Sequence, residues 1–251
     1  MAVVRWFFAL VFALAVPFWV AGAFTGRLPG APMDLPLAAL MFPAPLVAAL
    51  VLVRRREGPG APGRLLRASL VPGRASWLAV AVLVAVAVEL GGYGLAAVLG
   101  WPVTGEREPL SSAPVLLVVF LISGFCEEAG WTTYATGPLR DRLGRAGAGL
   151  VLGIVWAVWH LVPLAQAGRA PLWIAWWFLG TVAARLIMVW VWDRSGEVTM
   201  TAVVFHALLN VGPSLLPGYA AHDSLVAATA LTGATVAAVL FALPRRVAAP
   251  R

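Results

Sequence analysis

The sequence predicts an all-α fold: a polytopic transmembrane helix bundle of about eight spans, forming a single membrane domain over residues 1–251. Three observations predict it. Hydrophobic residues make up 61% of the chain, charged residues only 12%, and the mean hydropathy is +0.90, whereas a soluble domain is about 25% charged. The apolar residues fall into segments close to the roughly 20 residues that a helix needs to cross a bilayer core. The arginines gather in the short stretches between those segments.

In chain order the predicted spans are residues 3–24, 35–53, 76–99, 113–137, 147–165, 171–192, 198–217 and 224–243. The first span resembles a signal peptide, but its apolar run is longer than a usual signal core, so we expect a retained helix. Pro17 in this span, and Pro43 and Pro45 in the second, predict kinks. The Gly/Pro-rich, basic stretch from Arg54 to Arg74 is expected to be a loop on the cytoplasmic side.

Arginine supplies all 18 basic residues, because the chain has no lysine. Fourteen arginines fall on the side of the N terminus, three (Arg27, Arg107 and Arg169) fall on the opposite side, and Arg185 lies within a span. By the positive-inside rule this distribution predicts an even number of spans with both termini cytoplasmic. It also explains the net charge of +7 better than nucleic-acid binding does. The composition is typical of a GC-rich bacterial genome, so we expect a multi-pass protein of the bacterial inner (plasma) membrane.

The candidate site begins with two adjacent acids, Glu127 and Glu128, inside an apolar segment that runs from Ser111 to Leu139. A charged side chain at mid-bilayer costs roughly 2.5–3.5 kcal/mol, so a polar pair at this depth indicates a functional site. The two side chains differ by about 100° around a helix and cannot point at the same spot. One is expected to face the site, while the other supports it or pairs with a cation.

Other spans bring polar groups to a similar depth. The Glu pair lies about 14 Å from the cytoplasmic end of its helix, His206 about 12 Å and His160 about 15–20 Å, at 1.5 Å per residue. His206 and Asn210 are four residues apart and share one helix face. His160 continues a stripe of small residues (Gly149, Gly153 and Ala157) that predicts a helix–helix contact, so it faces the bundle interior. This convergence predicts a cavity that is reached from the cytoplasmic side.

These residue types suit hydrolysis of a peptide bond. A buried Glu can deprotonate a water molecule and a His can share the proton. A second His and an Asn on one helix face can donate hydrogen bonds to the oxyanion. Alternatively, Glu127, His160 and His206 bind Zn²⁺ and leave a water in the fourth position. No cofactor is certain from the sequence, because the H-E-x-x-H signature of zinc proteases is missing.

At these residues the chain resembles the CPBP family, which comprises intramembrane CAAX-type prenyl endopeptidases and bacterial relatives tied to bacteriocin processing and immunity. The family carries E-E-x-x-x-R, F-x-x-x-H and H-x-x-x-[N/D] on separate helices. Glu127-Glu128 match the first motif, the stretch from Trp156 to His160 matches the second with Trp in place of Phe, and His206 to Asn210 matches the third. The resemblance covers a protease-like core of about residues 111–217. It implies that Glu127 and His160 activate water and that His206 and Asn210 form an oxyanion hole.

One position departs from the family pattern: the motif Arg is Thr132, and the Gly that usually follows it is Thr133. Loss of this cation would leave a carboxylate uncompensated. Arg185, about 10 Å deep in its own span, is a candidate substitute that would pair with Glu128. Two other interpretations stay open, namely that Arg185 pairs with Glu89 or that it extends to the headgroups.

The sequence therefore predicts an intramembrane endopeptidase that acts on a peptide or protein substrate at the membrane. Its catalytic candidates are Glu127, Glu128, His160, His206 and Asn210, supported by Arg185, Trp156 and Thr132. Two alternatives remain: a catalytically degenerate protein acting in immunity or as a scaffold, which Thr132 favours, and a proton-coupled transporter. Internal symmetry between the halves would favour the transporter, and the sequence shows none.

Overall fold

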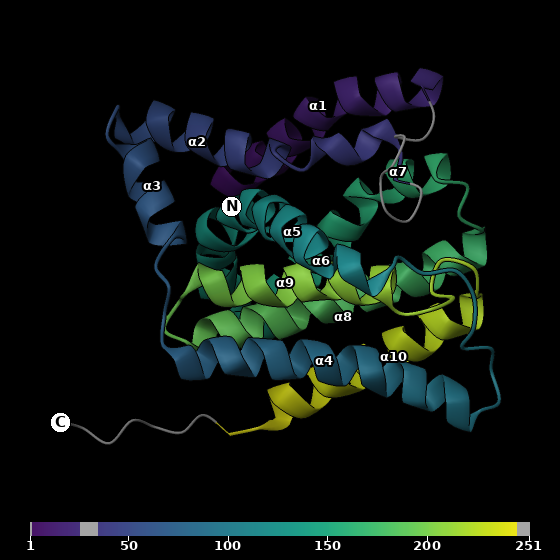
Figure 1. The fold of residues 1–251 in the computed structure, drawn as a ribbon. Coiled ribbons are helices and arrows are strands. Elements are labelled where there is room, and N and C mark those ends of the chain that lie inside the picture. Colours follow the sequence, from purple (N-terminus) through teal and green to yellow (C-terminus); the bar gives the residue numbers. More distant parts are fainter. Residues whose placement is uncertain (1, 26–34, 245–251) are drawn as a thin grey trace.

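The computed structural model describes residues 2–25 and 35–244, and within these residues the chain is all helical apart from its connections. The predicted all-α fold is confirmed. The helices run roughly parallel to one another (Figure 1). The longer elements are α1 (Ala2–Thr25), α2 (Ala44–Glu57), α4 (Ala75–Val98), α5 (Ala113–Glu128), α6 (Gly137–Trp159), α8 (Pro171–Arg194), α9 (Thr199–Leu215) and α10 (Asp223–Ala242).

The bundle has three layers when it is viewed as in Figure 1. Helices α1 and α2 lie together along one edge, and α4 and α10 lie along the opposite edge. Between them lie α5, α6, α8 and α9, with α5 against α9 and α6 against α8. The catalytic candidates come from α5, α6 and α9, and Arg185 comes from α8, so the central layer of the fold brings these residues together.

Six helical segments of the described chain are long and apolar enough to cross a membrane. One of them, the 57-residue segment Leu110–Gln166, contains both the fourth and the fifth predicted span. The seventh predicted span is the helix Thr199–Leu215, which is shorter than the others. Every predicted span is therefore helical, whereas the number of crossings and the side on which the termini lie stay predictions.

Short elements interrupt the long helices at positions that the sequence explains only in part. The 3-10 helix η2 (Leu37–Met41) ends just before α2 begins, and Pro43 lies between the two helices. This break agrees with the kink that the prolines of the second span predicted. Pro17, in contrast, lies inside the continuous helix α1. In α6 the backbone leaves helical geometry at Gly144, which has φ 70°. Another short helix, α7 (Leu161–Gln166), continues directly from His160.

The prediction of a loop from Arg54 to Arg74 was wrong in its centre, where helix α3 (Ala61–Ser69) forms. Gly58-Pro59 near the start of the stretch and Pro72-Gly73 near its end made it resemble a loop. The helix has one apolar face, and Ala61, Leu65 and Ser69 on it are buried. Ser69 contacts Thr133, whose hydroxyl lies 2.9 Å from that of Ser69 and 2.7 Å from that of Thr199. Thr133, in the family's glycine position, thus joins α3 to α9.

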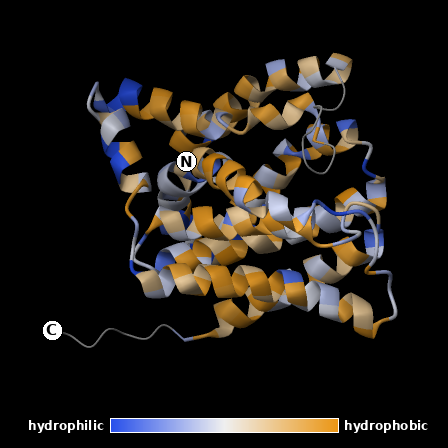
Figure 2. Ribbon diagram, in the orientation of Figure 1, coloured by the Kyte–Doolittle hydropathy of each residue, from blue (hydrophilic) through white to orange (hydrophobic). Residues whose placement is uncertain are grey.

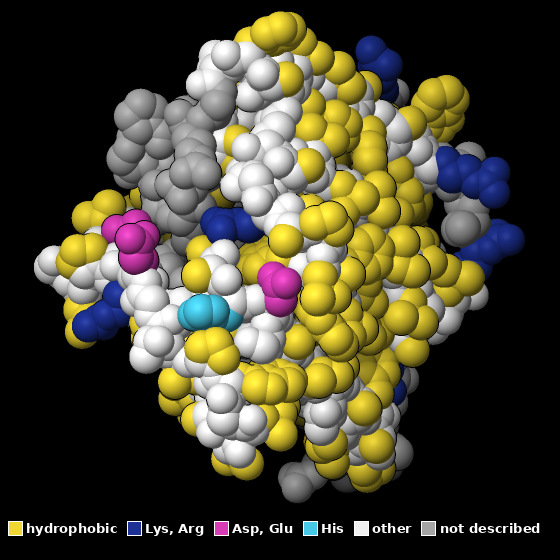
Figure 3. Space-filling model, turned by 90° about the vertical axis from the view of Figure 1, so that its right-hand side faces the viewer, with side chains coloured by type: hydrophobic (Ala, Val, Ile, Leu, Met, Phe, Trp, Pro, Cys, Tyr) yellow, Lys and Arg dark blue, Asp and Glu magenta, His cyan; other side chains and the backbone are white. Residues whose placement is uncertain are grey.

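The two ends of the bundle differ in charge. Hydropathy colouring places the strongly hydrophilic residues chiefly at the α2–α3 end (Figure 2). That end carries Arg5, Arg54, Arg55, Arg56, Arg64, Arg67, Arg74, Arg140, Arg142, Arg145 and Arg194. Figure 3 views the opposite end, where charged side chains are few and scattered among hydrophobic and uncharged groups. Within the described residues this opposite end has Arg107 and Arg169. The asymmetry in the folded molecule thus follows the arginine distribution along the chain.

Candidate active site

Glu127 and Glu128 are the last two residues of α5, and a π-helix, η4 (Ala129–Thr136), follows them directly. π-helical turns are rare and are frequent at functional sites. Both carboxyl groups are buried, with 5% of Glu127 and 0% of Glu128 exposed. They point to different surroundings, as the 100° rotation between neighbouring helix positions requires. Glu127 lines a cavity, and Glu128 lies in an ionic cluster behind it.

The ionic cluster is centred on the carboxylate of Glu128. Its Oε2 accepts hydrogen bonds from Thr132 Oγ1 at 2.5 Å and from Arg185 Nη1 at 2.6 Å. Its Oε1 accepts from Arg185 Nη2 at 3.0 Å and lies 2.9 Å from Nδ1 of His206. The structure therefore realises the first of the three interpretations of Arg185, the pairing with Glu128. The cation that the family motif would place at Thr132 is supplied by α8.

Arg185 is itself fully buried, at 0% exposure. Its guanidinium carbon lies 4.3 Å from the centroid of the Trp156 ring, a geometry in which the ring face attracts the cation. Nη1 also lies 3.4 Å from Thr132 Oγ1. Two buried opposite charges that share two hydrogen bonds compensate each other, whereas either one alone would be a strongly unfavourable buried charge.

Glu127 is held by the indole of Trp156, whose Nε1 donates to Oε2 at 2.8 Å. Trp156 comes from α6, so this bond joins α6 to α5 at the site. The other carboxyl oxygen, Oε1, is directed by the same bond and remains available to a molecule in the cavity. The sequence placed Trp156 in a supporting role, and the structure gives that role a specific contact.

His160 lies at the break between α6 and α7, and this break sets its orientation. Its backbone N–H bonds to the carbonyl of Ala157, while its Nδ1 lies 2.9 Å from the carbonyl oxygen of Trp156. A carbonyl oxygen can only accept, so Nδ1 carries a proton. In the neutral ring Nε2 then has the free lone pair. The ring lies among three indoles, with centroid distances of 4.8 Å to Trp159, 5.4 Å to Trp177 and 5.5 Å to Trp156.

His206 and Asn210 lie one turn apart on α9 and both line the cavity, as their four-residue spacing predicted. The His206 ring packs edge-on against Trp156 at 5.0 Å between centroids. Because ionised Glu128 can only accept, Nδ1 of His206 donates to it, and Nε2 is the nitrogen left for other contacts. Trp156 therefore contacts both histidines and holds Glu127, which places it at the centre of the site.

The predicted residues share one cavity of about 490 Å³. Glu127, His160, His206 and Asn210 all line it, and most of the remaining wall is apolar or aromatic. The small-residue stripe that predicted this arrangement is a close helix contact: a Cβ on Gly149 would lie 2.8 Å from Leu186, and one on Gly153 would lie 2.9 Å from the backbone of Val182. The approach of α6 to α8 brings His160 into the bundle interior.

The direction of the cavity differs from the prediction. Its wall beyond the polar residues is formed by residues nearer the arginine-poor end, among them Leu35, Ala167, Arg169 and Ala220. The cavity therefore extends toward the arginine-poor end, whereas the prediction, which considered only the depth of the polar residues, placed its entrance on the arginine-rich side; which end faces the cytoplasm stays a prediction. Depth says how far a group lies from an end, whereas the packing of side chains decides which end stays open.

The arrangement of the described side chains gives no support for a zinc ion. Among the described residues, no group of three or more His, Cys, Asp or Glu side chains is close enough together to hold a metal. The Nδ1 atoms of both histidines are engaged, one by the Trp156 carbonyl and one by Glu128, which leaves Nε2 of each ring for other contacts. Zinc binding by Glu127, His160 and His206 stays a prediction.

Two comparisons with known proteins concern this part of the chain. Residues 109–212 match the family model described as Rce1-like, type II CAAX prenyl endopeptidase. CAAX prenyl protease 2 of Methanococcus maripaludis is 30% identical over 112 residues, which is 41% of this chain and 41% of that protein. The chain thus matches about two-fifths of the length of this curated relative. The family match includes every predicted catalytic residue, and the resemblance to CAAX-type intramembrane endopeptidases of the CPBP family is confirmed.

Proposed function

We propose that this chain, which carries the CAAX-type endopeptidase segment within a membrane bundle, is an intramembrane endopeptidase of the bacterial inner (plasma) membrane. It hydrolyses a peptide bond of a membrane-associated or lipidated substrate with water that Glu127 and His160 activate. One observation carries the proposal: Glu127, His160, His206 and Asn210, from three different helices, line the same cavity. In a membrane, such polar side chains are costly unless they serve a site.

Water activation is assigned to Glu127 and His160. The indole Nε1 of Trp156 donates to one oxygen of Glu127, and the backbone carbonyl of Trp156 accepts from Nδ1 of His160. The remaining acceptor atoms, Oε1 of Glu127 and Nε2 of His160, are the ones offered to the cavity. A water between two such acceptors can lose a proton to one of them as it attacks the carbonyl carbon. The amine that leaves when the C–N bond breaks takes that proton up.

Oxyanion stabilisation is assigned to His206 and Asn210. The Asn210 side chain offers an amide N–H, which suits a developing negative charge. His206 can donate from Nε2 only when the ring carries both protons, because Nδ1 already donates to Glu128. The oxyanion role therefore requires the imidazolium form, and the carboxylate of Glu128 lies where it interacts favourably with that form. Arg185 keeps Glu128 ionised and in place by pairing with it.

The cavity wall supports an apolar, membrane-associated substrate. Leu40 on η2, with Val119 and Ile122 on α5, line the cavity, yet they are also exposed on the outside of the bundle. In a membrane this outer surface meets lipid, so a lipid chain or an apolar peptide segment could enter between these elements without crossing water.

The alternative of a catalytically degenerate protein lost its main support. The substitution at Thr132 favoured it, because a missing cation would leave Glu128 uncompensated. Arg185 supplies the cation, and Thr132 donates a further hydrogen bond to the same carboxylate. The site therefore retains the charge balance that the motif arginine would give.

The test is a peptidase assay with membranes containing the full chain or its Glu127→Gln variant. Glutamine keeps the size and can still accept from Trp156, but it cannot take a proton, so turnover should fall by roughly 10²–10⁴. Turnover equal to that of the unmodified chain would rule out the mechanism. The same assay with a chelator should show no loss, and chelator sensitivity that added zinc reverses would instead make Glu127 and the histidines metal ligands.

A further inference from the structure

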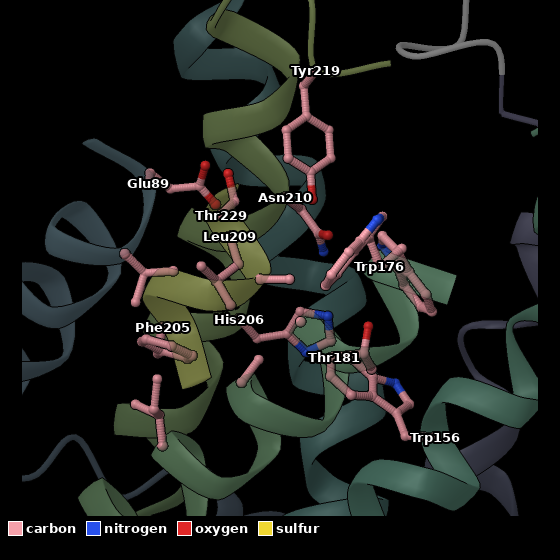
Figure 4. Close-up of a pocket in the computed structure, with 17 residues that line it drawn as sticks. Glu89, Trp156, Trp176, Thr181, Phe205, His206, Leu209, Asn210, Tyr219 and Thr229 are labelled. Carbon is pink, nitrogen blue, oxygen red and sulfur yellow. The ribbon is translucent and has the colours of Figure 1, made fainter. Parts of the chain in front are cut away.

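A second, smaller cavity of about 80 Å³ lies behind the active site, between α4, α8, α9 and α10 (Figure 4). It is distinct from the main cavity in most of its wall, which includes Glu89, Thr181 and Thr229. The two cavities nevertheless share part of their lining, including His206, Asn210 and Trp156. We call this smaller cavity the side chamber. The oxyanion-binding residues thus stand between it and the main cavity.

The wall of the side chamber is mostly apolar, but it carries several polar side chains, among them Glu89, Asn210 and Thr229. In Figure 4 Glu89 and Thr229 lie close together on one side, and Asn210 lies near the ring of Tyr219. Thr229 donates its hydroxyl proton to the carbonyl of Leu225 at 3.0 Å, so its oxygen still has lone pairs to offer. The wall thus presents hydroxyl, amide and carboxyl groups to a small space. Such a wall suits water better than an apolar side chain.

Glu89 is the unusual member of this wall. It is 6% exposed, and its Oε2 makes no hydrogen bond with any described residue. Buried polar groups that find no partner in the protein are generally bonded to ordered water. The backbone of Gly212 leaves room for the carboxyl group, because a Cβ on Gly212 would lie only 2.9 Å from Cγ and 3.2 Å from Oε2 of Glu89. The fold therefore makes room for this acid at the end of the side chamber.

The chamber is large enough for several water molecules. One water needs roughly 10–15 Å³ of such volume together with two to four polar partners. Part of the wall is made by small residues, Gly180 and Ala184 on α8 and Ala230 and Gly233 on α10. Larger residues at those positions would close the space.

Hydrolysis inside a membrane has a supply problem that the side chamber would solve. Each cleavage consumes one water, but an apolar substrate that fills the main cavity excludes water from it. A store that adjoins His206 and Asn210 can still deliver water while the substrate is bound. We propose that the side chamber holds the water used in hydrolysis and that Glu89 is the positioning residue that retains it. This inference rests on the proposed peptidase function.

The test separates kcat from KM for the purified full chain and four variants. Glu89→Leu removes the anchor, and Ala230→Leu fills the chamber. Both should lower kcat by about tenfold or more and leave KM unchanged, because the loss is of a reactant and not of substrate binding. Glu89→Gln can still bind water and should retain most of the turnover. Ala237→Leu, a buried alanine of the same helix α10 that does not line the chamber, is the matched control and should behave like the unmodified chain.

Three results would overturn the proposal. The first is an unchanged kcat in both Glu89→Leu and Ala230→Leu, the second is an equal loss of kcat in Ala237→Leu, and the third is a raised KM with unchanged kcat in Glu89→Leu and Ala230→Leu. If neither Glu89→Leu nor Ala230→Leu folds, a high-resolution experimental structure of the unmodified chain decides the question. Water within hydrogen-bond distance of Glu89 supports the side chamber's role, and a dry chamber ends it. If the unmodified chain cleaves nothing, the peptidase function fails, and that structure still decides whether the chamber holds water.

Discussion

Arg185 on α8 binds Glu128 on α5 through two hydrogen bonds, of 2.6 and 3.0 Å, in a position where neither side chain is exposed. The two residues are 57 positions apart in the chain. Arg185 supplies the positive charge that the family motif supplies with its arginine at the position of Thr132. Thr132 donates a further hydrogen bond to the same carboxylate. Glu128 in turn contacts His206, so the ion pair reaches the proposed oxyanion-binding residue.

Breaking this pair should destabilise the protein and lower its activity. Arg185→Leu leaves Glu128 buried without its cation, which typically costs 3–5 kcal/mol. Thermal unfolding in detergent and the peptidase assay measure the two effects. Thr132→Arg added to Arg185→Leu should restore part of both, because it returns a cation to the motif position. A wild-type unfolding temperature in Arg185→Leu would contradict the pairing. Rescue by Glu89→Leu alone would assign Arg185 to Glu89.

Asn210 should act through its amide N–H and not through its volume. Asn210→Ala removes one oxyanion donor and should lower kcat by about 10²–10³. Asn210→Asp has almost the same shape but offers no N–H, so it should lose at least as much activity. The measurement is kcat with unchanged expression and unfolding temperature as controls. An active Asn210→Asp variant would show that the side chain fills space and stabilises no oxyanion.

Trp156 should be needed for its indole N–H, which orients Glu127. Trp156→Phe keeps an aromatic ring between the histidines but removes the donor, and loss of one orienting hydrogen bond should lower kcat by roughly tenfold. Trp159 offers a matched control, since it also lines the cavity but its Nε1 makes no hydrogen bond with the described residues. Trp159→Phe should retain more activity than Trp156→Phe. Equal losses would mean that the two indoles contribute through packing alone.

The mouth of the main cavity should be reached from outside the cytoplasm. The cavity wall includes Leu35, Arg169 and Ala220 near the arginine-poor end, and the positive-inside rule places the other end in the cytoplasm. In a Cys126→Ala background, which has no other cysteine, Ala220→Cys at the cavity wall should react with a membrane-impermeant maleimide in intact cells. Ala68→Cys, exposed on α3 at the arginine-rich end, should react only after lysis.

The reverse labelling pattern would place the mouth in the cytoplasm and overturn the orientation predicted from the arginines. Reporter fusions after Arg56 and Arg107 give an independent reading of the same topology, with a cytoplasmic signal expected for the first and an external signal for the second. Agreement of both methods would establish which end of the bundle faces the cytoplasm.

The sequence by itself determined the class of fold and most of the candidate site. Apolar segments of near-membrane length require helices, because only a helix satisfies its own backbone hydrogen bonds in lipid. The cost of polar groups at that depth then singled out Glu127, His160, His206 and Asn210, and the four-residue spacing on α9 placed His206 and Asn210 on one face. These inferences rest on local periodicity and on the solvent, which a sequence displays directly.

Only the tertiary structure decided how the helices meet. Four features depend on contacts between residues far apart in the chain: the partner of Arg185, the π-helix after Glu128, helix α3, and the end of the bundle toward which the cavity extends. Depth along a helix can be counted from the sequence, but rotation about the axis and the fit of facing side chains cannot. Glu128 and Glu89 are both acids in apolar spans, and it is the packing of α8 against α6 and η4 that brings Arg185 to one of them.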